Sequence, residues 1–176
     1  MATLFVDKID PQSGTSLEIG SSGDTITTAT GAKPSFNYPA FRAYTDTIQT
    51  TSSGVATKAA LDLETYDTDS CYDTSTYRFT PNLAGKYYFN FVATDNYTTT
   101  AATDAQIYIR KNGSDIAEFQ MNVKGGQYGT LTVSTTVDMN GSSDYVEFFL
   151  YYAGGSGVIW RNNSDRQFAE GFRIGS

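Results

Sequence analysis

The 176-residue sequence contains no histidine and only one cysteine, Cys71. Without imidazole, catalytic arrangements that use histidine as a base and all histidine-ligated metal sites are excluded. A single cysteine permits neither an internal disulfide nor a zinc cluster, and we interpret Cys71 as a small packing residue. Carboxylate catalysis is the remaining enzymatic route, but the spacing of the aspartates and glutamates singles out no catalytic pair. We therefore expect a protein that is not an enzyme.

Basic residues and long apolar segments are also scarce. The 12 Lys and Arg residues are outnumbered by 19 Asp and Glu residues, which gives a net charge of −7. Nucleic acids and anionic membranes require a basic surface, so neither is an expected partner. No stretch approaches the roughly 20 apolar residues of a membrane span. The N-terminus lacks the basic and apolar regions of a secretion signal. We expect a soluble protein made in a bacterial cytoplasm.

Aromatic residues, by contrast, are abundant, at 14% of the chain. Together with frequent threonine and glycine, they favour strands and turns over helices. From about residue 36, strand signals recur roughly every 8–12 residues, as is typical of an all-β sandwich, and Asn112-Gly113 predicts a tight hairpin. The ten strands that we expect are Ala40–Gln49, Val55–Leu63, Ser75–Thr80, Lys86–Thr94, Ala105–Lys111, Ile116–Met121, Gly129–Asp138, Tyr145–Tyr152, Val158–Arg161 and Phe168–Ile174.

Residues 1–35 differ in composition from the rest of the chain. Their few apolar side chains stand alone among Ser, Thr, Gly and Asp, and they are too few to form a core. The segment is either a flexible tail or an arm that buries these side chains against other copies or against a partner. Their recurrence between glycines favours the arm. The expected contact residues are Leu4, Phe5, Val6, Ile9, Leu17, Ile19 and Ile26.

The segment from Leu61 to Phe91 resembles the signature of the C1q-like globular domain. The matching positions are Asp67, Tyr72, Phe79, Gly85, Tyr87, Phe89 and Phe91, while Leu61 stands where the signature usually has Phe. Pro39–Ala43 resembles the first strand of that family, and Asp144–Phe148 and Phe168–Phe172 resemble its last strands. The resemblance covers about residues 38–175.

This resemblance implies an antiparallel jelly roll, related to tumour necrosis factor, that assembles as a homotrimer through aromatic faces. Phe79, Tyr87, Phe89, Phe91, Phe148 and Phe172 are expected to line the core or the trimer seam. Further tyrosines exceed what one sandwich interior needs and are candidates for an intersubunit interface. They are Tyr66, Tyr72, Tyr88, Tyr97, Tyr108, Tyr128, Tyr151 and Tyr152.

The arm, with phrases such as Gly20–Ile26, is similar to the segments that precede knobs in bacteriophage fibre and virion proteins. The resemblance implies a tail fibre or knob on the virion exterior. Residues 1–35 would bind other virion proteins, and residues 36–176 would bind a host-surface glycan or protein. The first alternative is a capsid decoration trimer that stabilises the shell. The second is a bacterial carbohydrate-binding or adhesive module that uses exposed rings such as Tyr97, Tyr128 or Trp160. For Trp160, packing beside Val158 and Ile159 is the favoured interpretation.

Asp67, Asp69 and Asp73 form the one candidate metal site. Calcium takes six to eight oxygen ligands, and these alternating carboxylates could supply some of them. The segment nevertheless lacks the glycine and the closing glutamate of an EF-hand loop. Asp67 also occupies a signature position, which indicates a structural turn. Calcium and a turn both remain open at this point.

Overall fold

The computed structural model describes residues 38–95, 103–123, 128–154 and 158–175, together with positions 9, 25, 27 and 30. The chain divides into two units, Met1–Phe36 and Asn37–Ser176. Most of the predicted arm therefore lies outside the described residues, including Leu4, Phe5, Val6, Leu17, Ile19 and Ile26. Ile9 is described, and its side chain is exposed.

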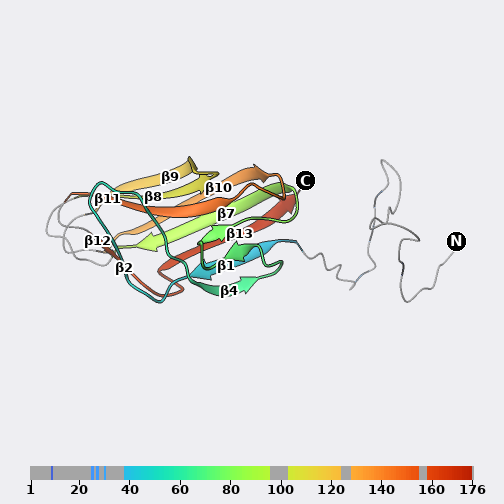
Figure 1. Cartoon of the computed structure of the whole chain (residues 1–176), viewed down its shortest axis with the longest axis horizontal. Coiled ribbons are helices and arrows are strands. Elements are labelled where there is room, and N and C mark those ends of the chain that lie inside the picture. The colour runs from blue at the N-terminus through green and yellow to red at the C-terminus, as the bar shows by residue number, and fades with distance from the viewer. Residues whose placement is uncertain are drawn as a thin grey trace. The chain divides into compact units, whose positions relative to one another are not determined.

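Two antiparallel sheets build the second unit (Figure 1). The five-stranded sheet has the order β10 (Thr130–Met139), β7 (Gly85–Thr94), β13 (Gln167–Gly175), β1 (Ala40–Tyr44) and β4 (Leu63–Asp67). The six-stranded sheet has the order β5 (Tyr72–Asp73), β6 (Arg78–Phe79), β11 (Val146–Ala153), β8 (Thr103–Lys111) and β9 (Ser114–Val123), and β3 (Thr57–Lys58) pairs with β11. A short ladder joins β2 (Gln49–Thr51) to β12 (Val158–Trp160).

The predicted all-β antiparallel sandwich is confirmed. No helix occurs in the part of the chain that the structure describes, and hence none there could cross a membrane. The predicted hairpin at Asn112-Gly113 joins β8 to β9. Strands distant in sequence are neighbours in space, since β1 pairs with β13 and β13 pairs with β7.

The predicted strand boundaries are wrong in the first third of the unit, and thirteen described strands replace the expected ten. The range Ala40–Gln49 is broken after Tyr44, because the Thr47 N–H donates to the Thr45 hydroxyl at 3.1 Å and turns the chain. Of the range Val55–Leu63, only Thr57–Lys58 and the first residue of β4 are extended. The pattern also did not predict β4 and β5, which surround the turn at residues 68–71.

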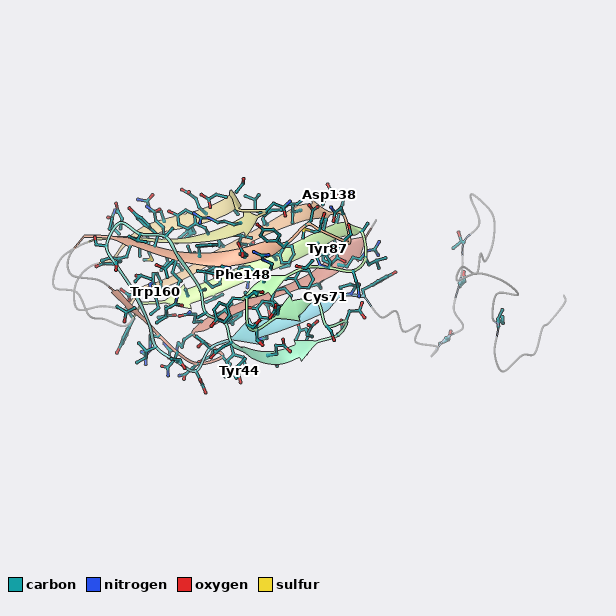
Figure 2. All side chains as sticks on the ribbon, in the orientation of Figure 1. Tyr44, Cys71, Tyr87, Asp138, Phe148 and Trp160 are labelled. Carbon is teal, nitrogen blue, oxygen red and sulfur yellow. The ribbon has the colours of Figure 1, made fainter. Side chains whose placement is uncertain are left out.

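Aromatic rings fill the space between the two sheets. Tyr87, Phe89 and Phe91 alternate along β7 and are fully buried. The Phe41 ring stacks against Tyr72 and Phe79, with ring centroids 4.9 and 4.7 Å apart. Figure 2 shows Tyr87 and Phe148 inside the sandwich. Each ring removed from water contributes about 1.5–3 kcal/mol, so this cluster is the main source of stability.

Trp160 belongs to the core at the β2–β12 end of the sandwich (Figure 2). Its ring is fully buried, and its indole N–H donates to the Thr51 hydroxyl at 3.1 Å. A buried ring cannot stack on a sugar, so Trp160 is a packing residue, as its apolar neighbours favoured, and not a carbohydrate contact. Tyr128 is exposed, with the Arg161 guanidinium 4.7 Å from its ring centroid. Tyr97 lies outside the described residues.

Candidate subunit interface

The outer side of the five-stranded sheet carries a row of aromatic side chains that we call the aromatic face. Strand alternation produces it, because successive side chains of a strand point to opposite sides. On β7, for example, Tyr87 and Phe89 point into the core, so Tyr88 between them points outward. The members of the aromatic face are Tyr44, Tyr66, Tyr88, Phe168 and Phe172.

Phe172 and Tyr88 form a ring pair on this face. They are direct cross-strand neighbours, and their ring centroids lie 5.4 Å apart. Phe172 is 45% exposed, and Tyr66 on β4 is 43% exposed. Large apolar rings gathered on one face of a soluble domain are typical of an interaction surface rather than of ordinary solvent-facing sheet.

A polar row crosses the middle of the aromatic face. Arg42 on β1 forms an ion pair with Glu170 on β13 at 2.6 Å, and the Asn90 amide donates to the same carboxylate at 3.3 Å. The Arg42 guanidinium also lies 3.7 Å from the centroid of the Phe168 ring. Each charge already has a partner within the subunit, so covering this row would not leave an uncompensated buried charge.

A second apolar patch lies at the edge of the sandwich, on β9. Phe119 pairs with the core residue Ile107 on β8, which places its ring on the inner side of the six-stranded sheet. The ring is nevertheless 42% exposed, and Ile116 on the same strand is exposed as well. We call Ile116, Phe119 and the half-buried Met121 the β9 edge. The molecule therefore presents two different apolar patches.

Most signature residues lie in the core or in its turns. Phe79, Tyr87, Phe89, Phe91 and Phe148 are buried between the sheets, whereas Phe172 lies on the aromatic face. The Tyr72 hydroxyl donates to the Leu61 carbonyl at 3.0 Å, and burial raises the pKa of Tyr72 well above its ordinary value. Burial also raises the pKa of Tyr87 to about 12, although the nearby Arg173 charge acts in the opposite direction.

Gly85 begins β7 with a φ of +147°, a conformation that residues with a Cβ rarely adopt. This backbone conformation explains why the signature has glycine at this position. Cys71 is buried, and its thiol lies 3.6 Å from the Asp69 carbonyl oxygen. Burial is the main factor that raises the pKa of the Cys71 thiol. A buried, protonated thiol is a packing residue rather than a nucleophile.

Two of the three aspartates of the candidate calcium site, Asp67 and Asp73, hold turns through their carboxylates. The Asp67 carboxylate accepts the N–H of Tyr72 at 2.8 Å and, more weakly, that of Asp69 at 3.4 Å. The Asp73 carboxylate accepts the N–H and hydroxyl of Ser75 at 2.8 and 2.6 Å, and these bonds lower its pKa to about 2. Within the described ranges, no group of three or more acidic or cysteine side chains is arranged to hold a metal. The turn interpretation accounts for Asp67 and Asp73, and the described residues give the calcium interpretation no support.

Six of the surplus tyrosines divide among three environments. Tyr72 and Tyr152 fill the core, which their proposed interface role did not anticipate. Tyr66 and Tyr88 lie on the aromatic face. Tyr108 and Tyr151 lie on the outer side of the six-stranded sheet, where their rings meet edge to face with centroids 6.4 Å apart. Sequence reasoning missed Tyr44 and Arg42, which the alternation of β1 would have placed opposite the buried Phe41 and Ala43.

Comparison with known proteins rests on structure, because no family model and no curated protein sequence matches the chain. The globular domain of zebrafish complement 1qA superposes with a TM-score of 0.53 at 17% identity, covering 78% of this chain and 97% of that one. The fold is that of the C1q/TNF-like globular domain. Murine APRIL at pH 5.0 gives a TM-score of 0.61 at 6% identity, covering 78% of this chain and 99% of its own.

The Eiger TNF of S. frugiperda is a third example of the C1q/TNF-like fold, with a TM-score of 0.54 at 7% identity over 80% of this chain and 95% of that one. These low identities establish the arrangement of strands alone. The interface residues therefore follow only from the geometry of this chain. The exposed ring of Phe172 and the internally paired charges of Arg42 and Glu170 indicate a surface that a second subunit can cover.

Proposed function

We propose that the chain is a non-enzymatic structural protein that assembles as a homotrimer of C1q/TNF-like heads on a bacteriophage particle. The observation that supports this assembly is the presence of two different apolar patches, the aromatic face and the β9 edge. When one patch of a subunit binds the other patch of the next subunit, the contact is heterologous. Such contacts form a closed ring if the rotation from one subunit to the next divides a full turn evenly. The aromatic face of one subunit packs on the β9 edge of the next.

The composition of the two patches supports an obligate contact. Stable interfaces between permanent partners commonly bury about 2,000–5,000 Å² and are rich in aromatic residues at their centre. The aromatic face supplies five rings on four strands, and its charges are already paired within the subunit. Light scattering at micromolar concentration is expected to give three times the 19.2 kDa mass of the chain. A single-chain mass would refute the assembly.

The phage role rests on the composition of the N-terminal segment. We assign the seven apolar contact residues of residues 1–35, from Leu4 to Ile26, to attachment to other virion proteins. Each arm alone binds weakly, but three arms on one trimer bind together and gain by effective concentration. The head faces outward from the tail or capsid and binds the surface of the host.

Quantifying the protein against the major capsid protein in purified particles tests this assignment. A few copies per particle are expected for a tail fibre or knob. Many copies spread over the shell would indicate the alternative, a capsid decoration trimer whose heads chiefly stabilise the particle. Absence of the protein from purified particles would contradict both virion roles, whatever its oligomeric state.

A further inference from the structure

The outer side of the six-stranded sheet, opposite the aromatic face, is divided into two halves of different chemistry. One half is charged and internally paired. Glu147 lies 2.6 Å from the Lys58 ammonium and 2.9 Å from the Arg78 guanidinium, and Arg110 lies 2.5 Å from Asp115. These pairs satisfy one another, so this half offers little to a ligand.

The other half carries three aromatic rings, Tyr108, Phe149 and Tyr151, which we call the ring platform. Phe149 and Tyr108 are cross-strand neighbours, and Tyr151 meets Tyr108 edge to face. The Arg110 guanidinium covers Phe149 at 4.0 Å from the ring centroid, and Tyr108 is only 8% exposed. Phe149 and Tyr151 are both half-buried, and Tyr151 is the one that the Arg110 guanidinium does not cover.

Amide side chains extend from the open ring across the sheet. Tyr151 is opposite Gln106 on β8, and Gln106 is opposite Gln120 on β9, so the three side chains form one row. The Tyr108 hydroxyl donates to the Gln106 amide oxygen, which leaves the Gln106 N–H groups to donate elsewhere. Gln120 is exposed, and within the described ranges its side chain has no hydrogen-bond partner. The row combines a stacking surface with unused donors and acceptors.

We propose that this row binds a neutral pyranose of a glycan, with Tyr151 against the sugar ring and the amides of Gln106 and Gln120 on its hydroxyls. A pyranose has an apolar C–H face and a polar hydroxyl edge, which an aromatic ring and an adjacent amide match. Neighbouring strands are about 4.8 Å apart, so successive side chains in the row are spaced on the scale of one sugar ring.

The charges of this region select a neutral sugar over an anionic one. The nearby cations Lys58 and Arg110 are held by Glu147 and Asp115, while Glu118 lies exposed beside the row without an ion-pair partner among the described residues. The net charge of −7 adds to the repulsion of anionic glycans. The biological meaning of the site rests on the proposed host-binding role, but the site itself needs only one subunit.

The experiment uses the full-length protein on an array of neutral oligosaccharides built from glucose, galactose, mannose, xylose and N-acetylhexosamines, with sialylated and phosphorylated glycans alongside. The best neutral binder is then titrated by calorimetry against Tyr151→Ala, Tyr151→Phe and Gln120→Ala. Tyr38→Ala, which removes an equally exposed ring just before β1, is the matched control. Light scattering of each variant reports assembly separately.

We expect Tyr151→Ala and Gln120→Ala each to weaken binding by about tenfold or more, with Tyr151→Phe and Tyr38→Ala within about threefold of the parent. The site is refuted if no neutral glycan binds, if only anionic glycans bind, or if Tyr151→Ala binds as the parent does. Glycan binding by a protein that proves monomeric would leave this site intact and remove the proposed trimer. A trimer that binds no glycan would refute this site and leave the proposed trimer intact.

Discussion

The Phe89 ring lies directly against the backbone of Gly171, its cross-strand neighbour on β13. A methyl group placed on Gly171 would be 2.5 Å from Cδ1 and 2.8 Å from Cε1 of that ring. Phe89 is fully buried, and its ring centroid lies 5.5 Å from that of Phe79 in an edge-to-face arrangement. The Phe89 ring therefore has no free space into which it could move. The core ring of one strand therefore requires glycine on the next.

Gly171→Ala is expected to lower the free energy of unfolding by about 1–3 kcal/mol, because the added carbon overpacks the core. Gly175→Ala is the matched control on the same strand, since a methyl group there meets nothing within 4 Å. Denaturant unfolding at one fixed protein concentration measures both. Equal stability of the two variants would show that the core yields more easily than the packing indicates.

Phe172→Asp is expected to dissociate the trimer into folded monomers. The substitution places a charge where the ring pair with Tyr88 is covered by the next subunit, and truncating such a central aromatic residue costs about 2 kcal/mol or more. Light scattering gives the mass, and circular dichroism reports retained β structure. Val55→Asp is the control, because Val55 is also about half exposed, at 52%, but lies outside both patches. Dissociation by both variants would contradict the proposed contact surface.

Acid is expected to destabilise the head through Glu147. Burial favours protonation of this carboxyl, but hydrogen bonds and charges from Lys58 and Arg78 outweigh burial and hold its pKa below the ordinary 4.5. The carboxylate therefore contributes stability above pH 4.5, and that contribution is lost as the pH falls through the lower folded-state pKa.

Thermal melts from pH 6 to pH 3 measure this loss. Glu147→Gln should be less stable near neutral pH and should lose less stability in acid than the parent. Glu118→Gln, on the exposed side of β9, is expected to follow the parent profile throughout. A Glu147→Gln profile parallel to that of the parent would assign the acid response to other groups.

Calcium is expected to leave the melting temperature unchanged, because the carboxylates of Asp67 and Asp73 are engaged by turn N–H and hydroxyl groups. Asp67→Ala should instead cost about 1–3 kcal/mol in the absence of any metal, since the Tyr72 N–H loses its acceptor. Melts with excess calcium or a chelator test the first statement, and Asp62→Ala in the same segment is the control for the second. A calcium-dependent rise that Asp67→Ala abolishes would restore the metal interpretation.

Deleting residues 1–30 is expected to leave a trimeric, β-rich head that no longer joins particles. The aromatic face and the β9 edge both belong to the described head, so assembly should not need the arm. Light scattering and incorporation into particles measure the two properties independently. Normal incorporation of the shortened protein would contradict the anchoring role, and a monomeric head would show that the arm itself holds the trimer.

The sequence by itself determined the fold class and most of the core. The alternation of Tyr87, Phe89 and Phe91 could be interpreted without a structure, because side chains of a strand alternate strictly between two faces. Asn112-Gly113 likewise predicted its hairpin, since a two-residue turn is a local feature. The composition around Asp67 and Asp73 favoured turns. Only the N–H groups that donate to their carboxylates distinguished a turn from a metal site.

Only the tertiary structure decided which side of β13 meets the core. Along β13 the polar Gln167 and the small Ala169 and Gly171 point inward, while Phe168 and Phe172 point outward, the reverse of an ordinary half-buried strand. The reason is volume: the rings of β7 already fill the space beneath β13, so only small side chains fit there. That competition between strands 80 residues apart leaves an aromatic face uncovered, and no local pattern could reveal it.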